Sequence, residues 1–287
     1  MDGFPALVSD PWLNGRLTAL HACSDLWACG ARVSSAMATV TLPMVSAEEQ
    51  QELLVQTLAG IRSVLDEQEA ELIGGHTMES RSAPPVPASL GILITLTVNG
   101  NSPKSPWLKT GLRPGDALLI SRPLGTGVLF AGTMTGATKA TDLDAALKGM
   151  ACSQHVLLGQ IEPIREGIHA CTDITGFGLL GHLGEMLQNS PGLTVELDGS
   201  AIPAYPGALD LFKRGVSSTL APSNRTAWRW LEGPVQLKQP PSAGLLELLV
   251  DPQTCGPLLL ACSSATAAQL TQNGPWLQIG SATAAHG

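Results

Sequence analysis

Charge is scarce in this chain of 287 residues, and its basic residues form no run. Charged residues make up 14% of the sequence, and the formal net charge is −8. We therefore expect no nucleic-acid partner and no binding to an anionic membrane surface. A polyanionic small molecule is still compatible with this balance, because metal ions can supply positive charge locally.

Long apolar runs and ordered cysteine spacings are missing as well. The longest apolar stretches, such as Gly91–Val98, have the length of a strand and fall far short of a membrane span. The first residues, MDGFPALVSD, lack a basic region followed by an apolar core, so we expect no signal peptide. The six cysteines contain no Cys-x-x-Cys pair, which argues against a zinc site or a disulfide framework. We expect a cytoplasmic protein with reduced, mostly buried thiols.

What the chain does contain is enough apolar sequence, 44%, to bury a sizeable core in an α+β fold. The segment Asn99–Gly115 is dense in Gly, Pro, Asn and Ser, which is typical of a domain boundary. We predict an N-terminal domain over residues 1–103, with helices on one side of a sheet, and a larger C-terminal α+β domain over residues 104–287.

Apolar periodicity, caps and breakers predict the elements of each domain. The N-terminal domain should contain a helix from Asp10 to a stop at Gly30, a strand over Ala36–Leu42, a helix over Ser46–Asp66, and strands over Glu71–Ile73 and Ser89–Val98 separated by GGHTMESRSAPPVP. The C-terminal domain should contain strands over Asp116–Ser121, Gly167–Ile174, Thr194–Glu196, Pro257–Ala261 and Leu277–Ile279, and helices over Val128–Met134, Asp144–Ile161, Leu179–Gln188 and Ala265–Gln272.

Asp173 is the strongest candidate for chemistry. It ends an apolar strand and precedes Thr-Gly-Phe-Gly and a helix start. A Gly-rich turn that runs into a helix presents N–H groups and the positive end of the helix dipole to an anion. A carboxylate beside a phosphate makes sense with a divalent cation between them, and Mg²⁺ suits a site with few carboxylates. The alternative is that Asp173 or Thr175 simply caps the helix.

Asp25 is a second unusual carboxylate, because it lies near the negative, C-terminal end of its predicted helix. Its neighbours Cys23, Leu26, Trp27 and Cys29 suggest a face that is not freely solvated, where a metal ion or a buried partner would offset the penalty. His21, one turn earlier, is an alternative hydrogen-bond partner for Asp25.

Weaker signals lie elsewhere in the chain. Gly74-Gly75-His76 follows a predicted strand end and could place N–H groups and an imidazole against a phosphate, although a tight turn explains it equally well. Asp2 taken alone would belong to a disordered terminus. The turn Asp251–Gly256, DPQTCG, is more typical of architecture than of catalysis, and its Cys255 is either a reactive thiol or an inert small side chain.

These segments together resemble one family, the selenophosphate synthetases (selenide, water dikinases). The shared segments, in family order and approximate spacing, are LHACSDLWACGA, LIGGHTM, RPLGTGVL, HACTDITGFGLLGHLGEM and LLVDPQTCGPLLLA. The wider superfamily includes aminoimidazole ribonucleotide synthetase, thiamine-monophosphate kinase and a hydrogenase-maturation protein. The resemblance implies an N-terminal sheet domain that dimerises, a larger C-terminal α+β domain, and a reaction in which ATP, selenide and water give selenophosphate, AMP and phosphate.

The resemblance also implies roles for individual residues. Asp25 and Asp173 would be magnesium ligands, and Asp2 and Asp25 would belong to the ATP site. Gly74, Gly75 and His76 would form a nucleotide-contacting loop that can act on the ATP of the neighbouring subunit of a homodimer.

The chain departs from the family in two places. Family members carry, before the equivalent of Asp2, a segment with a Gly-rich loop, a reactive Cys or selenocysteine, an essential Lys and a further metal-binding Asp. The resemblance therefore implies weak or absent dikinase activity for the chain as it stands, and no catalytic residue is assigned. Cys255-Gly256-Pro257 also replaces the commoner Ser-Gly-Gly. The alternative functions are another kinase or synthetase of the superfamily, and a non-catalytic ATP-binding relative.

Overall fold

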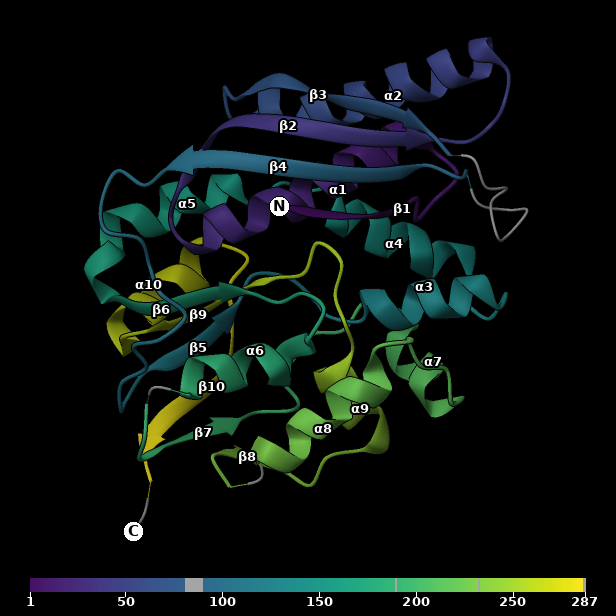
Figure 1. The fold of residues 1–287 in the computed structure, drawn as a ribbon. Coiled ribbons are helices and arrows are strands. Elements are labelled where there is room, and N and C mark those ends of the chain that lie inside the picture. Colours follow the sequence, from purple (N-terminus) through teal and green to yellow (C-terminus); the bar gives the residue numbers. More distant parts are fainter. Residues whose placement is uncertain (81–89, 189, 232, 286–287) are drawn as a thin grey trace. The chain divides into compact units, whose positions relative to one another are not determined.

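The computed structural model describes residues 1–80, 90–188, 190–231 and 233–285, which fall into two compact units (Figure 1). Unit 1 comprises Met1–Ser105 together with Ala151–His155, and unit 2 comprises Pro106–Met150 together with Val156–Gly287. Each unit contains one mixed sheet with packed helices, which is the α+β class predicted from the sequence.

Unit 1 is built on a four-stranded sheet in the order β1-β4-β2-β3. Its elements are β1 (Asp2–Pro5), α1 (Pro11–Ala28), β2 (Arg32–Leu42), α2 (Ala47–Asp66), β3 (Glu71–Glu79) and β4 (Leu93–Asn101). β4 is antiparallel to both β1 and β2, whereas β3 runs parallel to β2. Buried and more accessible residues alternate along β2, because one sheet face packs against α1 and α2 (Figure 1).

The two helices of unit 1 begin where the sequence predicts. The Asp10 carboxylate accepts a hydrogen bond from the Leu13 amide at the start of α1. Ser46 and Glu49 form a reciprocal capping box at the start of α2. The helices then approach closely at Gly15, where a Cβ atom would meet the Thr57 carbonyl oxygen at 2.1 Å. Glycine is therefore required at this crossing.

Unit 2 is built on a six-stranded sheet in the order β6-β9-β5-β10-β7-β8. Its elements are β5 (Ala117–Ile120), α3 (Thr126–Met134), α4 (Ala140–Met150), α5 (His155–Ile161), the 3₁₀ helix η1 (Glu162–Gly167), β6 (Ile168–Asp173), α6 (Gly178–Leu187), β7 (Leu193–Leu197), α7 (Ala208–Lys213), α8 (Ala221–Leu231), β8 (Val235–Leu237), α9 (Ala243–Val250), β9 (Leu258–Cys262), α10 (Ser264–Asn273) and β10 (Leu277–Ala284). β5 and β9 are buried at every residue, so both faces of the sheet are covered.

Several predicted boundaries are wrong. The helix predicted over Asp144–Ile161 is divided into α4 and α5, and at the break the Ala151 carbonyl accepts a hydrogen bond from Arg16 Nε at 3.0 Å. Helix α8 begins at Ala221, in the polar stretch Ser217–Arg225, where no helix was predicted. The strand predicted from Ser89 begins at a residue outside the described ones, and β4 is observed from Leu93.

Two expectations from composition can be compared with the structure. None of the six cysteines, all of which lie in the described ranges, is part of a disulfide, and those at positions 23, 171, 255 and 262 are buried. Among the helices of the described ranges, none is both long and apolar enough to cross a membrane.

Candidate functional site

Asp173 lies at the last position of β6, opposite Leu258 of β9, and only 3% of its surface is exposed. The next amide, that of Ile174, donates to the Pro257 carbonyl at 2.8 Å. The sheet therefore fixes the backbone on both sides of the carboxylate. The N-cap of α6 is Phe177, whose side chain makes no capping hydrogen bond, so neither Asp173 nor Thr175 is the N-cap residue. Asp173 is thus a buried carboxylate placed beside an uncapped helix start.

The turn between Asp173 and α6 is held mainly through Thr175. Its amide donates to His182 Nε2 at 3.1 Å, and its hydroxyl lies 3.2 Å from the same nitrogen. Its carbonyl accepts from the Gly178 amide at 3.0 Å and from the Gln253 amide at 2.9 Å. Gly178 has a φ of +69°, a left-handed conformation that favours glycine and allows the sharp entry into α6. The turn is therefore fixed from two sides.

His182 is the buried end of a polar chain that reaches the surface through Glu185 and Lys109, and sequence spacing did not identify this chain. Only 3% of the residue is exposed, and its Nδ1 lies 3.0 Å from Glu185 Oε2. Lys109 Nζ lies 3.1 Å from the same oxygen. Burial lowers the pKa of His182 below its ordinary value, although the negative charges of Asp173 and Glu185 act in the opposite direction. The imidazole is accordingly neutral near neutral pH.

The DPQTCG turn clamps the start of α3, more than a hundred residues away in the sequence. Gln253 Oε1 accepts hydrogen bonds from the Gly125 amide at 2.9 Å and the Thr126 amide at 3.1 Å. Asp251 Oδ2 accepts from the Val128 amide at 3.2 Å. The RPLGTG and DPQT motifs are therefore one structural unit, which agrees with the architectural interpretation of the turn.

Asp251 is fully buried, and within the described part of the chain its Oδ1 has no hydrogen-bond partner. Burial raises its pKa to about 7, although hydrogen bonds from the Val128 amide and Gln253 oppose the shift. Cys255, in the same turn, is 3% exposed and has a φ of +50°, and its carbonyl accepts from Arg122 Nη1 at 3.1 Å. This burial favours the inert alternative for the thiol over the reactive one.

In unit 1, Asp2 is part of β1 and not of a disordered terminus. Its Oδ2 lies 2.9 Å from His21 Nε2 of α1, and its Oδ1 accepts from the Gly3 amide at 2.7 Å. Partial burial acts to raise the pKa of Asp2, but the hydrogen bond and charge of His21 outweigh it and lower the pKa below its ordinary value. The Phe4 ring meets the His21 ring edge-on at 5.5 Å between centroids. The His21 imidazole is therefore a partner of Asp2.

Asp25 lies in the last turn of α1, where its carbonyl accepts from the Cys29 amide at 3.2 Å. The Asp25 side chain is exposed to solvent, so the expectation that it lies on a face shielded from water is wrong. Solvation reduces the cost of a negative charge at this end of the helix dipole. A carboxylate that water can reach is also open to a hydrated metal ion.

Gly74, Gly75 and His76 were predicted to form a loop, and this prediction is wrong. All three lie inside β3, paired with Met37, Ala38 and Thr39 of β2. Strand pairing overrides the low strand propensity of the two glycines, and a Cβ atom on Gly75 would meet the Ala38 carbonyl oxygen at 1.9 Å. These residues therefore form part of an exposed edge strand.

The sheet register separates these residues from Asp2. Asp2 pairs with Leu96, Leu96 with Ala38, and Ala38 with Gly75, so the four lie in one row across the sheet. His76 belongs to the neighbouring row through Thr39 and therefore points to the other face. Within one chain, Asp2 faces α1 while His76 faces away from it.

The donor set fits magnesium in its chemistry. Asp25 and Asp173, the predicted magnesium ligands, offer carboxylate oxygens, which this ion prefers. Among the described residues, no group of three or more His, Cys, Asp or Glu side chains could enclose a metal ion. Such a sparse set suits an ion whose remaining ligands are phosphate oxygens and water. Asp25 belongs to unit 1 and Asp173 to unit 2, and their roles as magnesium ligands stay predictions.

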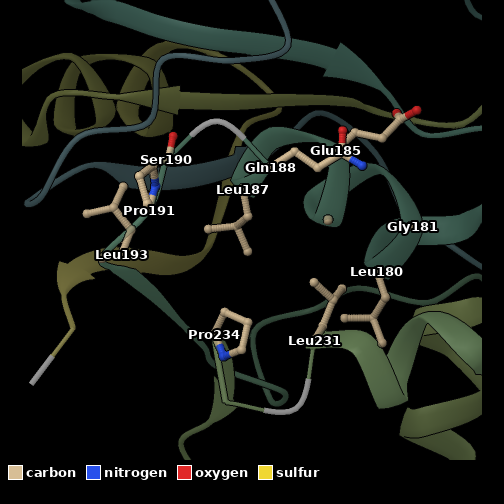
Figure 2. Close-up of a pocket in the computed structure, with 12 residues that line it drawn as sticks. Leu180, Gly181, Glu185, Leu187, Gln188, Ser190, Pro191, Leu193, Leu231 and Pro234 are labelled. Atoms are coloured by element: carbon tan, nitrogen blue, oxygen red, sulfur yellow. The ribbon is translucent and has the colours of Figure 1, made fainter. Parts of the chain in front are cut away.

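A cavity of about 490 Å³ lies beside α6, and the turn that joins Asp173 to this helix does not line it (Figure 2). Leu180, Leu187, Leu231 and Pro234 surround its apolar interior, and Glu185 and Gln188 stand at its wall. None of the predicted site residues lines this cavity. It is therefore separate from the carboxylate site at Asp173.

Known proteins resemble the chain over both units. Residues 1–101 match the family description "AIR synthase related protein, N-terminal domain", and residues 113–287 match "AIR synthase related protein, C-terminal domain". A selenide, water dikinase of Bdellovibrio bacteriovorus is 31% identical over 276 residues, which cover 95% of this chain and 73% of the relative. A selenide, water dikinase of Desulfitobacterium hafniense is 35% identical over 262 residues, which cover 91% of this chain and 71% of the relative.

Solved structures support the same fold. Thiamine-monophosphate kinase from Stenotrophomonas maltophilia superposes with a TM-score of 0.68 at 18% identity, covering 100% of this chain and 82% of the other. Hydrogenase maturation protein HypE in complex with ATP superposes with a TM-score of 0.67 at 19% identity, covering 99% and 76%. The two-domain fold predicted from the sequence is thereby confirmed. By fold, family description and identity over nearly its whole length, the chain belongs to the selenide, water dikinase family of phosphotransferases, within the AIR synthase related proteins.

Proposed function

We propose that this chain binds ATP together with Mg²⁺ and serves the synthesis of selenophosphate from ATP, selenide and water, with AMP and phosphate as the other products. The observation that carries this proposal is the identity of 31% to a selenide, water dikinase along 95% of the chain. The fold alone would not separate this activity from that of thiamine-monophosphate kinase, which shares it at 18% identity.

The residues of this chain suit a nucleotide site of that kind. The buried Asp173 carboxylate and the exposed Asp25 carboxylate would hold magnesium, which when bound supplies positive charge against the phosphate oxygens. The uncapped start of α6 offers backbone N–H groups to a phosphate. Phosphoryl transfer depends more on positioning and charge neutralisation than on a covalent protein group, so the assignment needs no nucleophile from these residues.

A homodimer is part of the proposal. Asp2 and His76 lie on opposite faces and in strands at opposite edges of one sheet, so a site that uses both takes them from two chains. Apolar side chains are exposed on the His76 face, including Met37 at 48% and Met78 at 43%. An exposed apolar sheet face next to an open strand edge is typical of an interface. We therefore expect Gly74, Gly75 and His76 to contact the nucleotide held by the partner chain.

Calorimetric titration with ATP in the presence of Mg²⁺ tests the nucleotide site. The wild-type chain should bind, and Asp173→Asn should weaken the affinity by about tenfold or more, because it removes a charged metal ligand. Asp210→Asn is the matched control, since this carboxylate is 78% exposed on α7 and lies outside the proposed site. Unchanged affinity in Asp173→Asn would contradict the assignment of this residue.

The selenium chemistry requires a separate experiment. Phosphorus NMR of anaerobic mixtures with ATP and selenide should show selenophosphate and AMP, in parallel samples with thiamine monophosphate as the competing substrate. ATP binding without selenide-dependent AMP formation would leave the chain as a non-catalytic ATP-binding relative. Phosphorylation of thiamine monophosphate instead would assign it to another branch of the superfamily.

A further inference from the structure

One side chain near Asp173 has no assigned role, yet three hydrogen-bond distances converge on it. His182 Nε2 lies 3.1 Å from the Thr175 amide nitrogen and 3.2 Å from the Thr175 hydroxyl. Its Nδ1 lies 3.0 Å from Glu185 Oε2. Because an amide N–H can only donate, Nε2 must be the acceptor, and the ring proton must lie on Nδ1, facing the Glu185 carboxylate. The contacts select one tautomer.

The contacts of Glu185 extend this arrangement. Glu185 Oε2 also accepts from Lys109 Nζ at 3.1 Å. The imidazole is therefore held in the ring plane by a carboxylate that is itself paired with a cation. The Phe177 ring covers the histidine from the turn side, with 5.7 Å between ring centroids. A buried imidazole fixed on two sides is a rigid support for whatever its Nε2 binds.

What Nε2 binds is the middle of the turn that follows Asp173. The β6–β9 ladder fixes Asp173 itself, and the Ile174 amide is fixed by Pro257. The next amide, that of Thr175, has no strand partner and is directed into the imidazole. Its orientation determines the path of the chain from the carboxylate to the helix start, and so the direction of the amides at the start of α6.

We propose that His182 is a positioning residue of the nucleotide site: by accepting the Thr175 amide, it fixes the α6 start relative to the Asp173 carboxylate, so that one metal–phosphate group can meet both. This inference rests on the proposed function, since it names how the ATP site is kept in shape. His182 itself touches neither metal nor phosphate. Glu185 and Lys109 act indirectly: Glu185 holds the His182 ring, and Lys109 holds Glu185.

Substitutions at position 182 separate the acceptor from the rest of the side chain. His182→Gln places an amide oxygen near the position of Nε2 and can still accept the Thr175 amide. His182→Ala and His182→Leu cannot accept it, and the leucine keeps the buried volume filled. Glu185→Gln retains an acceptor for Nδ1–H and removes only the charge. Thermal unfolding identifies any variant that does not fold, and the leucine variant then replaces the alanine one.

One measurement reports on the hydrogen bond between His182 and the Thr175 amide, and a second reports on the affinity of the nucleotide site. Hydrogen exchange of the Thr175 amide, followed by NMR, should be slow in the wild type and in His182→Gln and fast in His182→Ala and His182→Leu. Electron paramagnetic resonance with Mn²⁺ and a non-hydrolysable ATP analogue should show the affinity for the metal–nucleotide pair falling about tenfold in the two non-accepting variants. Affinity should be restored to within about threefold of wild type in His182→Gln.

The outcomes are separable. If the wild type does not bind Mn²⁺ with the analogue, the proposed function itself fails. If the wild type binds, and His182→Leu exposes the Thr175 amide to exchange without changing the affinity, then the function stands and the positioning role is overturned. A His182→Gln variant that protects the amide but binds as weakly as His182→Leu would overturn it equally, because the acceptor would then not be what matters.

Discussion

Asp2 and Gly75 lie in the same row of the unit 1 sheet, at its two opposite edges. The row runs from Asp2 through Leu96 and Ala38 to Gly75. Three steps between neighbouring strands place the two residues roughly 14 Å apart. A single phosphate cannot contact both within one chain.

Gly75→Ala should destabilise unit 1, because its new Cβ atom would meet the Ala38 carbonyl oxygen at 1.9 Å. Backbone would have to move in the β2–β3 ladder, and we expect a loss of about 2 kcal/mol or more in the free energy of unfolding. Gly74→Ala is the control, since no heavy atom lies within 4 Å of a Cβ added there. Urea unfolding measures both, and equal stability of the two variants would show that the close approach is relieved at no cost.

Met37→Glu should convert a homodimer into monomers. Met37 is 48% exposed on the sheet face that also carries His76, and a charge buried there without a partner would oppose association. Met134→Glu, at a residue 83% exposed in unit 2, adds the same charge elsewhere and should leave the dimer intact. Sedimentation velocity over a range of concentrations distinguishes these cases. A wild-type chain that is monomeric throughout would contradict the proposed dimer.

The elements that could be predicted from the sequence are those with local signals. Asp10 before Pro11 and the Ser46/Glu49 capping box mark helix starts through contacts only three residues long, and the structure has both. The position of Asp173 at the end of β6 could be predicted for the same reason, because the apolar strand and the Gly-rich turn are adjacent in the sequence. Local chemistry was a sufficient guide there.

Features that depend on contacts between residues far apart in the sequence could not be predicted from local signals. The glycines at 74 and 75 signal a loop locally, and only the parallel ladder with β2 makes them a strand. Gln253 contacts Thr126 across 127 residues of sequence, which no spacing rule anticipates. His182 lies seven residues from Thr175, a spacing that is not a contact spacing within one helix. Its role depends on the turn that brings the two together.

Asp251 should give the folded chain a distinctive dependence of stability on pH. Its pKa is raised from 3.8 to about 7 by burial, so between these values the folded protein keeps a proton that the unfolded chain has lost. Stability should therefore fall as the pH rises through this window, by an amount on the order of 4 kcal/mol from this residue alone. Below the window both states are protonated, and above it both are ionised.

Asp251→Asn mimics the protonated acid and should remove this contribution. Urea unfolding at about pH 5 and about pH 8 should show that the wild type loses more stability between the two than the variant does. The variant should be the more stable protein at the higher pH, because it buries no charge. If the two proteins have parallel pH profiles, Asp251 is ionised in the folded state throughout, and the burial argument is wrong.

Gln253→Glu should break the clamp between the DPQT turn and α3, for a reason of charge and not of size. Gln253 Nε2 donates to Asp251 Oδ2 at 3.1 Å, while Oε1 accepts from the Gly125 and Thr126 amides. A glutamate keeps the acceptor but places a second buried carboxylate against the first, which is destabilising by about 2–4 kcal/mol at a pH where both tend to ionise. The control is Gln236→Glu on β8, where the side chain is exposed.

The sharper test is the double variant Gln253→Glu with Asp251→Asn. In the wild type residue 253 donates to residue 251, whereas in the double variant residue 251 donates to residue 253. An asparagine amide at 251 can donate to the new glutamate, so the pair should recover part of the lost stability. The Asp251 carbonyl, which accepts from Gln253 Nε2 at 2.8 Å, loses its donor in both proteins that carry the glutamate. Urea unfolding of the wild type, both single variants and the double variant at about pH 8 completes the cycle. Additive effects of the two substitutions would mean that residues 251 and 253 are not coupled through this hydrogen bond. A favourable coupling would show that the hydrogen bond between residues 251 and 253 helps to hold the DPQT turn in the shape that meets the α3 start.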